Sequence, residues 1–177
     1  PEGSGCGLVT VDKGGAAVMS GWLAEGTVMS QSVPVSQEGD WPLYVPLYSG
    51  KGLLMAWLRF TLPAGLTNEM TSWIKPTNSA SAYYRGGFTN EFATTGSAYV
   101  YVNTNRVLGL TNGLMVFRGG NLAAPFTNDV TLTPPAKLSS TTTNNRLVLT
   151  IVVSSGLFNG SAIPPGKTSL QAEMIRP

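Results

Sequence analysis

The sequence predicts an all-β protein, folded as a single β-barrel or β-sandwich of about ten to twelve mainly antiparallel strands. Apolar residues recur with period two in short runs, and Gly, Pro, Asn and Ser separate these runs. No stretch of ten or more residues has the 3.6-residue period of a helix. At 177 residues the chain fits one domain. We expect that domain over residues 8–177, after a flexible Gly-rich arm at residues 1–7.

Each expected strand rests on its own apolar pattern. Lys167–Met174 alternates apolar and polar residues, which predicts a half-buried strand. Arg146–Val153 and Leu53–Phe60 are apolar on both faces, which is typical of strands covered on both sides. The other expected strands are Leu8–Val11, Ala17–Leu23, Val28–Val35, Trp41–Tyr48, Met70–Ile74, Tyr99–Val102, Leu114–Arg118 and Val130–Thr133.

Turn-forming residues between these runs predict how the strands connect. Asn112-Gly113 and Asn159-Gly160 are candidates for hairpin turns, because both residue types tolerate positive φ. Gly14-Gly15 is a further turn signal. Pro42 and Pro46 lack backbone donors, so their strand should lie at a sheet edge or at a bulge.

One short sequence pattern occurs twice in the chain. Residues 87–91 (GFTNE) and 125–129 (PFTND) share a Phe-Thr-Asn-acid pattern. We interpret both as corners between a loop and a strand, where Phe enters the core and Asn or the acid closes an Asx turn. The alternative is a pair of oxygen-rich calcium sites, but the chain lacks the acid-rich loop that calcium requires.

The composition predicts an extracellular or cell-surface protein. Charged residues make up 11% of the chain, against about 25% in an average soluble domain. The net charge is +2 and the basic residues are scattered, so we expect no nucleic-acid partner. No apolar run reaches the roughly 18 residues of a membrane-spanning helix, and we expect no membrane insertion. Because the chain begins at Pro1, we expect it to be processed from a longer protein.

The search for catalytic chemistry finds no candidate. Histidine is absent, which removes the commonest general base and zinc ligand. Residues 49–52 (SGKG) lack the flanking residues of a phosphate-binding loop. Glu38 and Asp40 are the only close carboxylate pair, and we interpret them as a solvated hairpin tip. We therefore predict a protein that is not an enzyme and has no cofactor or metal.

The aromatic residues are candidates for recognition. Exposed aromatic rings can stack on the apolar faces of sugars. Trp22 and Trp57 lie in apolar runs, and we expect them in the core. Tyr83 and Tyr84 lie in the polar loop 77–87, so we expect them to be exposed, where they would contact a ligand or a neighbouring subunit.

Several motifs together resemble a known type of module. They are residues 40–52 (DWPLYVPLYSGKG), 56–58 (AWL), 72–76 (SWIKP), the Tyr83-Tyr84 pair, 87–90 (GFTN), 109–113 (GLTNG), 119–122 (GGNL) and 125–128 (PFTN). They resemble a secreted β-module of very large surface proteins from environmental Gram-negative bacteria. The resemblance covers roughly residues 8–175 and implies no catalytic residues. A copy of this size standing alone suggests a self-assembling fibre subunit.

Two functions follow as hypotheses. The first is a structural subunit of an extracellular fibre or surface assembly that forms a homopolymer by strand or arm exchange. The arm leads into an apolar run that could pair with a neighbour's sheet edge, so Cys6, Leu8, Val9 and Val11 are the predicted intersubunit residues. The alternative is an adhesive module that binds carbohydrate or a cell surface.

We also expect a covalent bond to reinforce the assembly. Cys6 is the only cysteine, so it either links two chains or has no role. Alternatively, a buried lysine condenses with an amide or acidic side chain, assisted by a carboxylic acid. Lys13, Lys51 and Lys75 lie beside apolar strands and are the candidates. Solvated lysines at strand ends are the simpler interpretation. The candidate acids are Glu69, Glu91 and Asp129.

Overall fold

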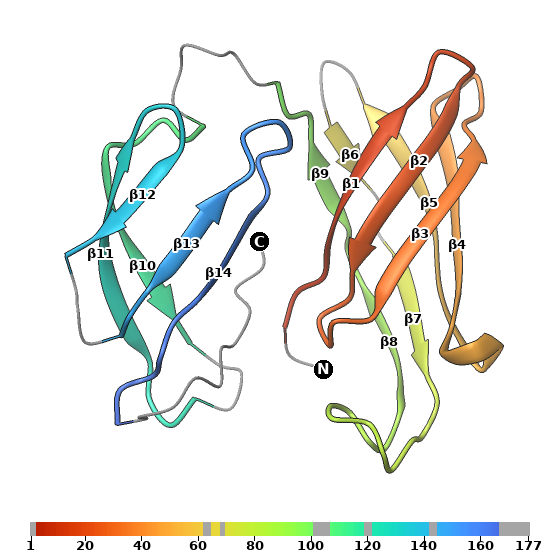
Figure 1. The fold of residues 1–177 in the computed structure, drawn as a ribbon. Helices are drawn as coiled ribbons and strands as arrows, with labels where there is room; N and C mark the ends of the chain where they lie inside the picture. The colour runs from red at the N-terminus through yellow and green to blue at the C-terminus, as the bar shows by residue number, and fades with distance from the viewer. Residues whose placement is uncertain are drawn as a thin grey trace. The chain divides into compact units, whose positions relative to one another are not determined.

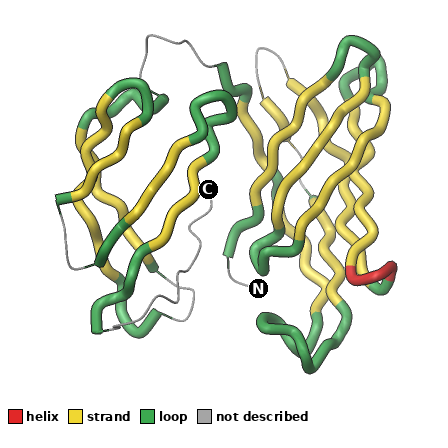
Figure 2. The backbone as a smooth tube through the Cα atoms, viewed as in Figure 1, coloured by secondary structure: helices red, strands yellow, loops and turns green. Residues whose placement is uncertain are grey.

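The computed structural model describes residues 3–61, 65–67, 70–100, 107–118, 122–141 and 145–166. These residues form fourteen strands and one short 3-10 helix, Tyr48–Gly50. Every strand pairing is antiparallel, and Figures 1 and 2 show strands and loops almost throughout. The all-β prediction is confirmed. No helix in the described ranges has the length and apolar character needed to cross a membrane.

The contacts within the chain divide it into two compact units, whereas the sequence predicted one domain over residues 8–177. The first unit is Gly3–Ala98, and the second begins at Tyr99. Each unit has strands and buried apolar residues of its own, so each is described by itself.

The first unit contains two antiparallel sheets. One has three strands in the order β1-β2-β3, and the other has six, in the order β8-β7-β5-β6-β9 with β4 paired to β5. The strands of this unit are β1 (Cys6–Val11), β2 (Ala16–Trp22), β3 (Val28–Pro34), β4 (Asp40–Leu47), β5 (Gly52–Thr61), β6 (Gly65–Thr67), β7 (Thr71–Lys75), β8 (Phe88–Phe92) and β9 (Thr95–Ser97).

The core of the first unit lies between the two sheets. The strands β2, β4, β5 and β7 alternate buried and more exposed positions, as period-two sequences require. Burying these side chains is the main stabilising term, at about 25 cal/mol per Å² of apolar surface. The buried apolar residues are Ala17, Met19, Leu23, Trp41, Leu43, Val45, Leu47, Leu54, Leu58 and Trp73.

The strand β4 lies at an edge, as Pro42 and Pro46 predicted. Among the described strands, β4 pairs only with β5. On its other side, a side chain from β3 replaces the backbone ladder. The Gln31 amide donates to the carbonyls of Pro42 (3.0 Å) and Tyr44 (3.2 Å). Its oxygen accepts from Trp41 Nε1 at 3.1 Å. Gln31 therefore joins the two sheets where proline prevents regular pairing.

The strand β1 includes the end of the predicted arm. It pairs with β2 without interruption from Cys6↔Trp22 to Val11↔Ala17. Cys6 and Gly7 therefore belong to a sheet of their own chain, so the arm predicted over residues 1–7 is too long.

The second unit contains a three-stranded sheet, β10-β11-β12, and a separate hairpin, β13-β14. Phe126 begins β11 and stacks on Phe117 with ring centroids 4.6 Å apart. The buried apolar residues of the second unit include Leu132, Ile151 and Ile163. The strands are β10 (Asn112–Phe117), β11 (Phe126–Thr133), β12 (Lys137–Ser140), β13 (Val148–Ile151) and β14 (Phe158–Ser161).

Two turn predictions are wrong, and the repeated Phe-Thr-Asn-acid pattern has a structural explanation. Asn112-Gly113 and Asn159-Gly160 both lie within strands, β10 and β14, because their neighbours pair in register. The pattern places Phe88 and Phe126 at the first positions of β8 and β11, so it marks strand starts rather than Asx turns.

Two expected strands need separate comment. Tyr99 and Val100 are not in a strand, and residues 101–102 lie outside the described residues, as does the run Lys167–Met174. The structure adds β6, β8, β9, β12 and β14, which are short and carry little apolar alternation.

Candidate functional site

A tight turn between β2 and β3 carries Glu25 into the interior of the first unit. The Leu23 amide donates to the Thr27 carbonyl (2.9 Å), and the Gly26 amide donates to the Leu23 carbonyl (2.8 Å). Gly26 has φ +87°, which a residue with a side chain rarely adopts. The turn therefore fixes Glu25 with its side chain only 5% exposed.

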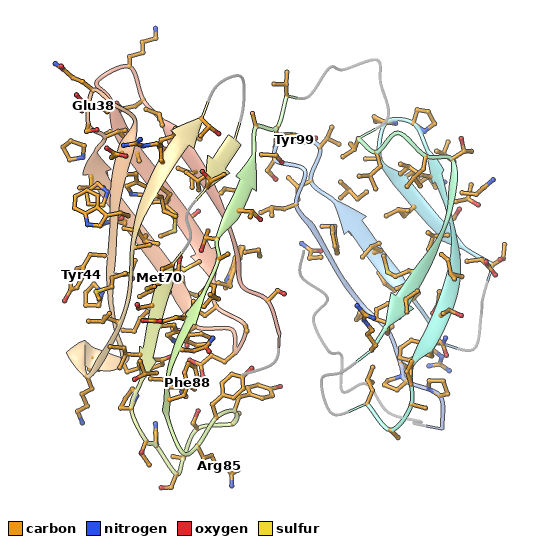
Figure 3. The ribbon with its side chains drawn as sticks, turned by 180° about the vertical axis from the view of Figure 1, so that it is seen from behind. Glu38, Tyr44, Met70, Arg85, Phe88 and Tyr99 are labelled. Atoms are coloured by element: carbon orange, nitrogen blue, oxygen red, sulfur yellow. The ribbon has the colours of Figure 1, made fainter. Side chains whose placement is uncertain are left out.

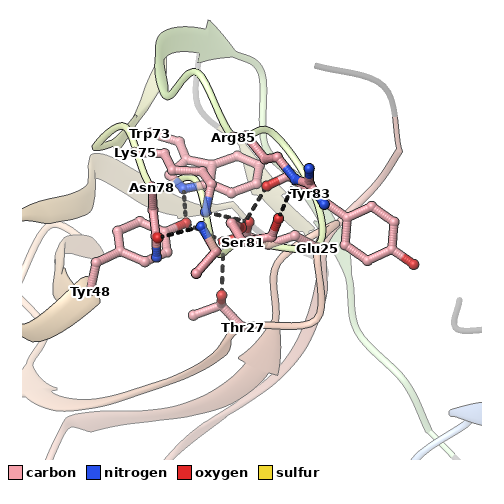
Figure 4. A network of polar contacts seen from close by, with 10 residues as sticks. Glu25, Thr27, Tyr48, Trp73, Lys75, Asn78, Ser81, Tyr83 and Arg85 are labelled. Atoms are coloured by element: carbon pink, nitrogen blue, oxygen red, sulfur yellow. Dashed lines mark hydrogen bonds and ion pairs between the residues drawn. The ribbon is translucent and has the colours of Figure 1, made fainter.

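Glu25 is the centre of a buried polar network (Figure 4). Its Oε2 lies 2.8 Å from Lys75 Nζ. Its Oε1 accepts hydrogen bonds from the Tyr48 hydroxyl and from Thr27 Oγ1, the latter at 2.8 Å. The Tyr48 oxygen in turn accepts from Trp73 Nε1 at 3.0 Å. Both carboxylate oxygens therefore have partners, as a buried charge requires.

The network changes the acidity of two of its members. Burial opposes ionisation of Glu25, but hydrogen bonds from Lys75, Tyr48 and Thr27 outweigh it and hold the pKa of Glu25 below its ordinary value. Burial, and then the hydrogen bond to Glu25, raise the pKa of the Tyr48 hydroxyl. Tyr48 therefore stays protonated and can donate to the carboxylate across the whole physiological pH range.

Aromatic side chains surround the ion pair. Lys75 Nζ lies 4.4 Å from the centroid of the Tyr48 ring, a cation–π contact. Phe88 meets Trp73 edge to face at 4.7 Å and Tyr84 at 5.3 Å. These rings pack around Trp73, whose indole donates to Tyr48.

Tyr48 reaches Glu25 from a strained backbone position. Its φ of 54° is in the left-handed region, which costs a non-glycine residue about 1–3 kcal/mol. The hydrogen bonds to Glu25 and from Trp73 hold the side chain in place despite this cost.

Of the three lysines predicted for covalent chemistry, the structure buries one. Lys75 has a side chain that is 3% exposed, whereas Lys13 and Lys51 are exposed. The acid beside Lys75 is Glu25, which the sequence analysis did not select. No local pattern links the two residues, because the turn between β2 and β3 and the strand β7 meet only in the folded unit.

The three acids that the sequence selected do not form this site. Glu91 and Asp129 are exposed, and Glu69 lies outside the described residues. The Asp40 carboxylate is held by Arg59 at 2.6 and 2.9 Å, which lowers its pKa. Asp40 thus forms an ion pair at the surface, and Glu38 is exposed. Both positions agree with the expectation that these two acids are solvated. Within the described ranges, no three His, Cys, Asp or Glu residues gather as metal ligands.

The side of β4, β5 and β7 that points away from the core, which we call the outer face, is apolar. Trp57 is 72% exposed, Tyr44 54% and Met55 45%. Tyr44 lies opposite Met55, and Pro42 opposite Trp57, so these side chains are neighbours on one surface. Figure 3 shows Tyr44 projecting from the sheet. The outer face consists of Pro42, Tyr44, Pro46, Leu53, Met55, Trp57, Ser72 and Ile74.

The predicted core position of Trp57 is therefore wrong. Trp57 and Leu58 point to opposite sides of β5, and Leu58 is the residue that faces the core, at 1% exposed. Trp22 is half-buried, while Trp41 and Trp73 are the buried tryptophans. An apolar run on both faces of β5 does not reveal which face the unit covers.

The two loop tyrosines differ. Tyr83 is 52% exposed, as predicted. Tyr84 is instead half-buried, with its ring edge-to-face against Trp73. The loop that presents Tyr83 is held by internal hydrogen bonds, including Ser81 Oγ to the Tyr83 carbonyl (2.6 Å) and Arg85 Nε to the Ser81 carbonyl (3.0 Å).

The predicted intersubunit residues lie in β1. Cys6, Leu8 and Val9 are all half-buried, and Val9 packs against the core. Only Val11, at 50% exposed, is largely accessible. Exchange of this strand between subunits would thus first require its removal from β2.

Comparison with known proteins adds no family to this description. No family model, curated protein or solved structure matches the chain significantly. The resemblance to a secreted surface module therefore stays a prediction, and the function has to be argued from the residues.

Proposed function

We propose that this chain is a non-catalytic structural module of an extracellular fibre or surface assembly, and that copies of it associate through the outer face. The observation that supports this proposal is the 72% exposure of Trp57 beside Tyr44 and Met55. A single exposed apolar residue is ordinary, but a contiguous group with a tryptophan at its centre is typical of interaction surfaces.

The composition of the outer face favours a protein partner. Its centre is aromatic and aliphatic, and the Asp40–Arg59 ion pair borders it at one end. An apolar centre with a polar rim is the usual arrangement of protein interfaces. Tryptophan and tyrosine are also the residues that most often dominate binding energy.

The two prolines of β4 favour association by the face rather than by the β4 edge. Pro42 and Pro46 cannot donate backbone hydrogen bonds, so an incoming strand would pair poorly with β4. The edge of β1 has no such protection in the described residues. Addition or exchange of β1 is therefore the second route by which copies could join.

Substitution of Trp57 tests the proposal. The oligomer distribution of wild type, Trp57→Ser and Val28→Ser should be measured by sedimentation velocity across a range of concentrations. Val28 is 67% exposed on β3 and serves as the control. We expect Trp57→Ser to weaken association at least about 30-fold, as for the loss of a 2 kcal/mol hot spot, and Val28→Ser to have little effect.

The same experiment distinguishes the two routes of assembly. Deletion of residues 1–11 removes β1 and the core contact of Val9, so circular dichroism must first show that the shortened chain stays folded. A folded deletion variant that still associates would favour the outer face, and one that no longer associates would favour β1 exchange. A wild type that stays monomeric at every concentration would contradict self-association by either route.

Carbohydrate binding is the second candidate. Tyr44 and Trp57 are diagonal neighbours across β4 and β5, with the Asp40–Arg59 pair beside them. Aromatic rings beside polar groups are suited to stack on sugars and bind their hydroxyls. Retardation of the wild type, but not of Trp57→Ser, in polysaccharide-containing gels would support this candidate. Equal mobility of both proteins would contradict it.

A further inference from the structure

The contacts of Glu25 set the two oxygens of its carboxylate in different environments. Oε1 accepts two hydroxyl donors, Tyr48 and Thr27, whereas Oε2 faces the amine of Lys75 at 2.8 Å. A nucleophile and a pair of oxyanion donors thus lie on opposite oxygens of one carboxyl group. This arrangement is suited to acyl transfer to an amine, in which hydrogen-bond donors stabilise the oxygen that becomes negative.

We propose that Lys75 and Glu25 condense into an intrachain amide that covalently joins the turn between β2 and β3 to the strand β7. The proposal does not depend on the proposed assembly function. It places the predicted covalent link within one chain, between two elements of the first unit, rather than between subunits.

The reaction needs no external reagent. The Lys75 ammonium first gives one proton to Oε2 of Glu25, which leaves a neutral amine beside a carboxylic acid. The amine lone pair attacks Cδ, and the electron pair of the carbonyl bond moves to Oε1. Oε1 then re-forms its carbonyl, Oε2 leaves as water with a second proton from the nitrogen, and the N–Cδ bond remains. One ammonium and one carboxylate become one amide and one water.

Two features of the site favour the reaction once the proton has moved to Glu25. The hydroxyls of Tyr48 and Thr27 already point at Oε1, where negative charge develops in the tetrahedral intermediate. The Trp73 indole donates to the Tyr48 oxygen at 3.0 Å, which leaves the Tyr48 proton directed at Glu25. The amine is also held close to the carboxyl group, so the approach of the reactants carries little entropic cost.

Burial also favours the product over the ion pair. The two side chains are 3% and 5% exposed, and two charges held away from water carry a large desolvation penalty even when paired. An amide has no net charge, and the water that it releases enters the solvent. The dry surroundings that destabilise the ion pair therefore favour condensation.

The intact mass of the folded full-length chain, measured after denaturation, tests the proposal. We expect the wild type to be lighter than its sequence mass by one water molecule. Trypsin cuts after Lys13, Lys51, Arg59 and Arg85, so digestion should yield a branched peptide that joins residues 14–51 to residues 60–85. A wild type at its full sequence mass, or a water loss mapped to other residues, would overturn the proposal.

Variants show whether the site performs the chemistry. Lys75→Arg keeps the positive charge but should restore the full mass, whereas Lys51→Arg, at an exposed lysine, should still lose water. Tyr48→Phe removes one oxyanion donor and should slow the appearance of the lighter species after refolding about 100-fold. If any variant fails to fold, the wild-type mass and its branched peptide still decide the question. An unchanged rate in folded Tyr48→Phe would overturn the assigned role of Tyr48.

Discussion

The two faces of β4, β5 and β7 differ in what surrounds equally apolar side chains. On the inner face, Trp41 and Trp73 are 2% and 4% exposed, and their ring nitrogens donate to Gln31 and Tyr48. On the outer face, Trp57 is 72% exposed. The inner face therefore holds the unit together, while the outer face is available for a partner. The same residue type has opposite roles on neighbouring strands.

The comparison shows that an apolar strand can have a structural face and a binding face. β5 alternates between them at every residue, so a shift of one position would exchange the two sets of side chains. Substitutions on the inner face should thus lower the free energy of unfolding. Those on the outer face should affect association alone.

The largest effect is expected from Trp41→Ala. This change leaves a cavity beside Leu43 and Leu58 and removes the hydrogen bond to Gln31, which should lower the free energy of unfolding by about 3–5 kcal/mol. Urea denaturation followed by circular dichroism measures it. A loss below about 1 kcal/mol would show that the inner face is not a packed core.

Lys75→Met should have a comparable effect. It leaves the Glu25 carboxylate buried without a cation, at a cost of about 3–5 kcal/mol, and it also prevents the proposed amide. The double variant Glu25→Leu/Lys75→Met removes both charges and should recover part of the lost stability. If the single and double variants unfold alike, the charge left on Glu25 is not the cause of the loss.

Acid should distinguish the ion pair from the amide. As a free carboxylate, Glu25 has a folded pKa below its unfolded value of 4.5. Its contribution is then complete above that pH and is lost as the pH falls through the folded pKa. An amide does not titrate, so linked wild type should lose less thermal stability than Lys75→Arg between pH 5 and about pH 3. Equal losses in both proteins would argue against the amide.

Trp57→Ser should have the smallest effect on folding. A substitution at an exposed position usually changes stability by less than about 0.5 kcal/mol, so its urea transition should match that of the wild type. A large loss of stability would mean that Trp57 contributes to the core of the unit.

Much of the fold could be predicted from the sequence, because alternation and turns are local. The runs that became β1 to β5, β7, β10, β11 and β13 were expected within a few residues. Two Asn-Gly pairs misled the turn assignment, since pairing with a neighbouring strand outweighed their local preference.

The candidate site was less predictable, because it depends on contacts distant in the sequence. Lys75 could be selected beside an apolar strand, but its partner Glu25 lies in a turn whose polar residues resemble a solvated loop. The outer face could not be predicted from the sequence for a related reason. Period two shows that Trp57 and Leu58 point in opposite directions, but not which of them faces the core.

Hydroxyl-radical footprinting at increasing protein concentration tests the difference between the two faces most directly. Our account predicts that Trp57 is the most readily oxidised tryptophan in dilute protein, and that it becomes protected as copies associate. Trp41 should stay unreactive throughout, and exposed Val28 should react equally at every concentration. Constant oxidation of Trp57 while association proceeds would contradict the account, because the copies would then be joined through a different surface.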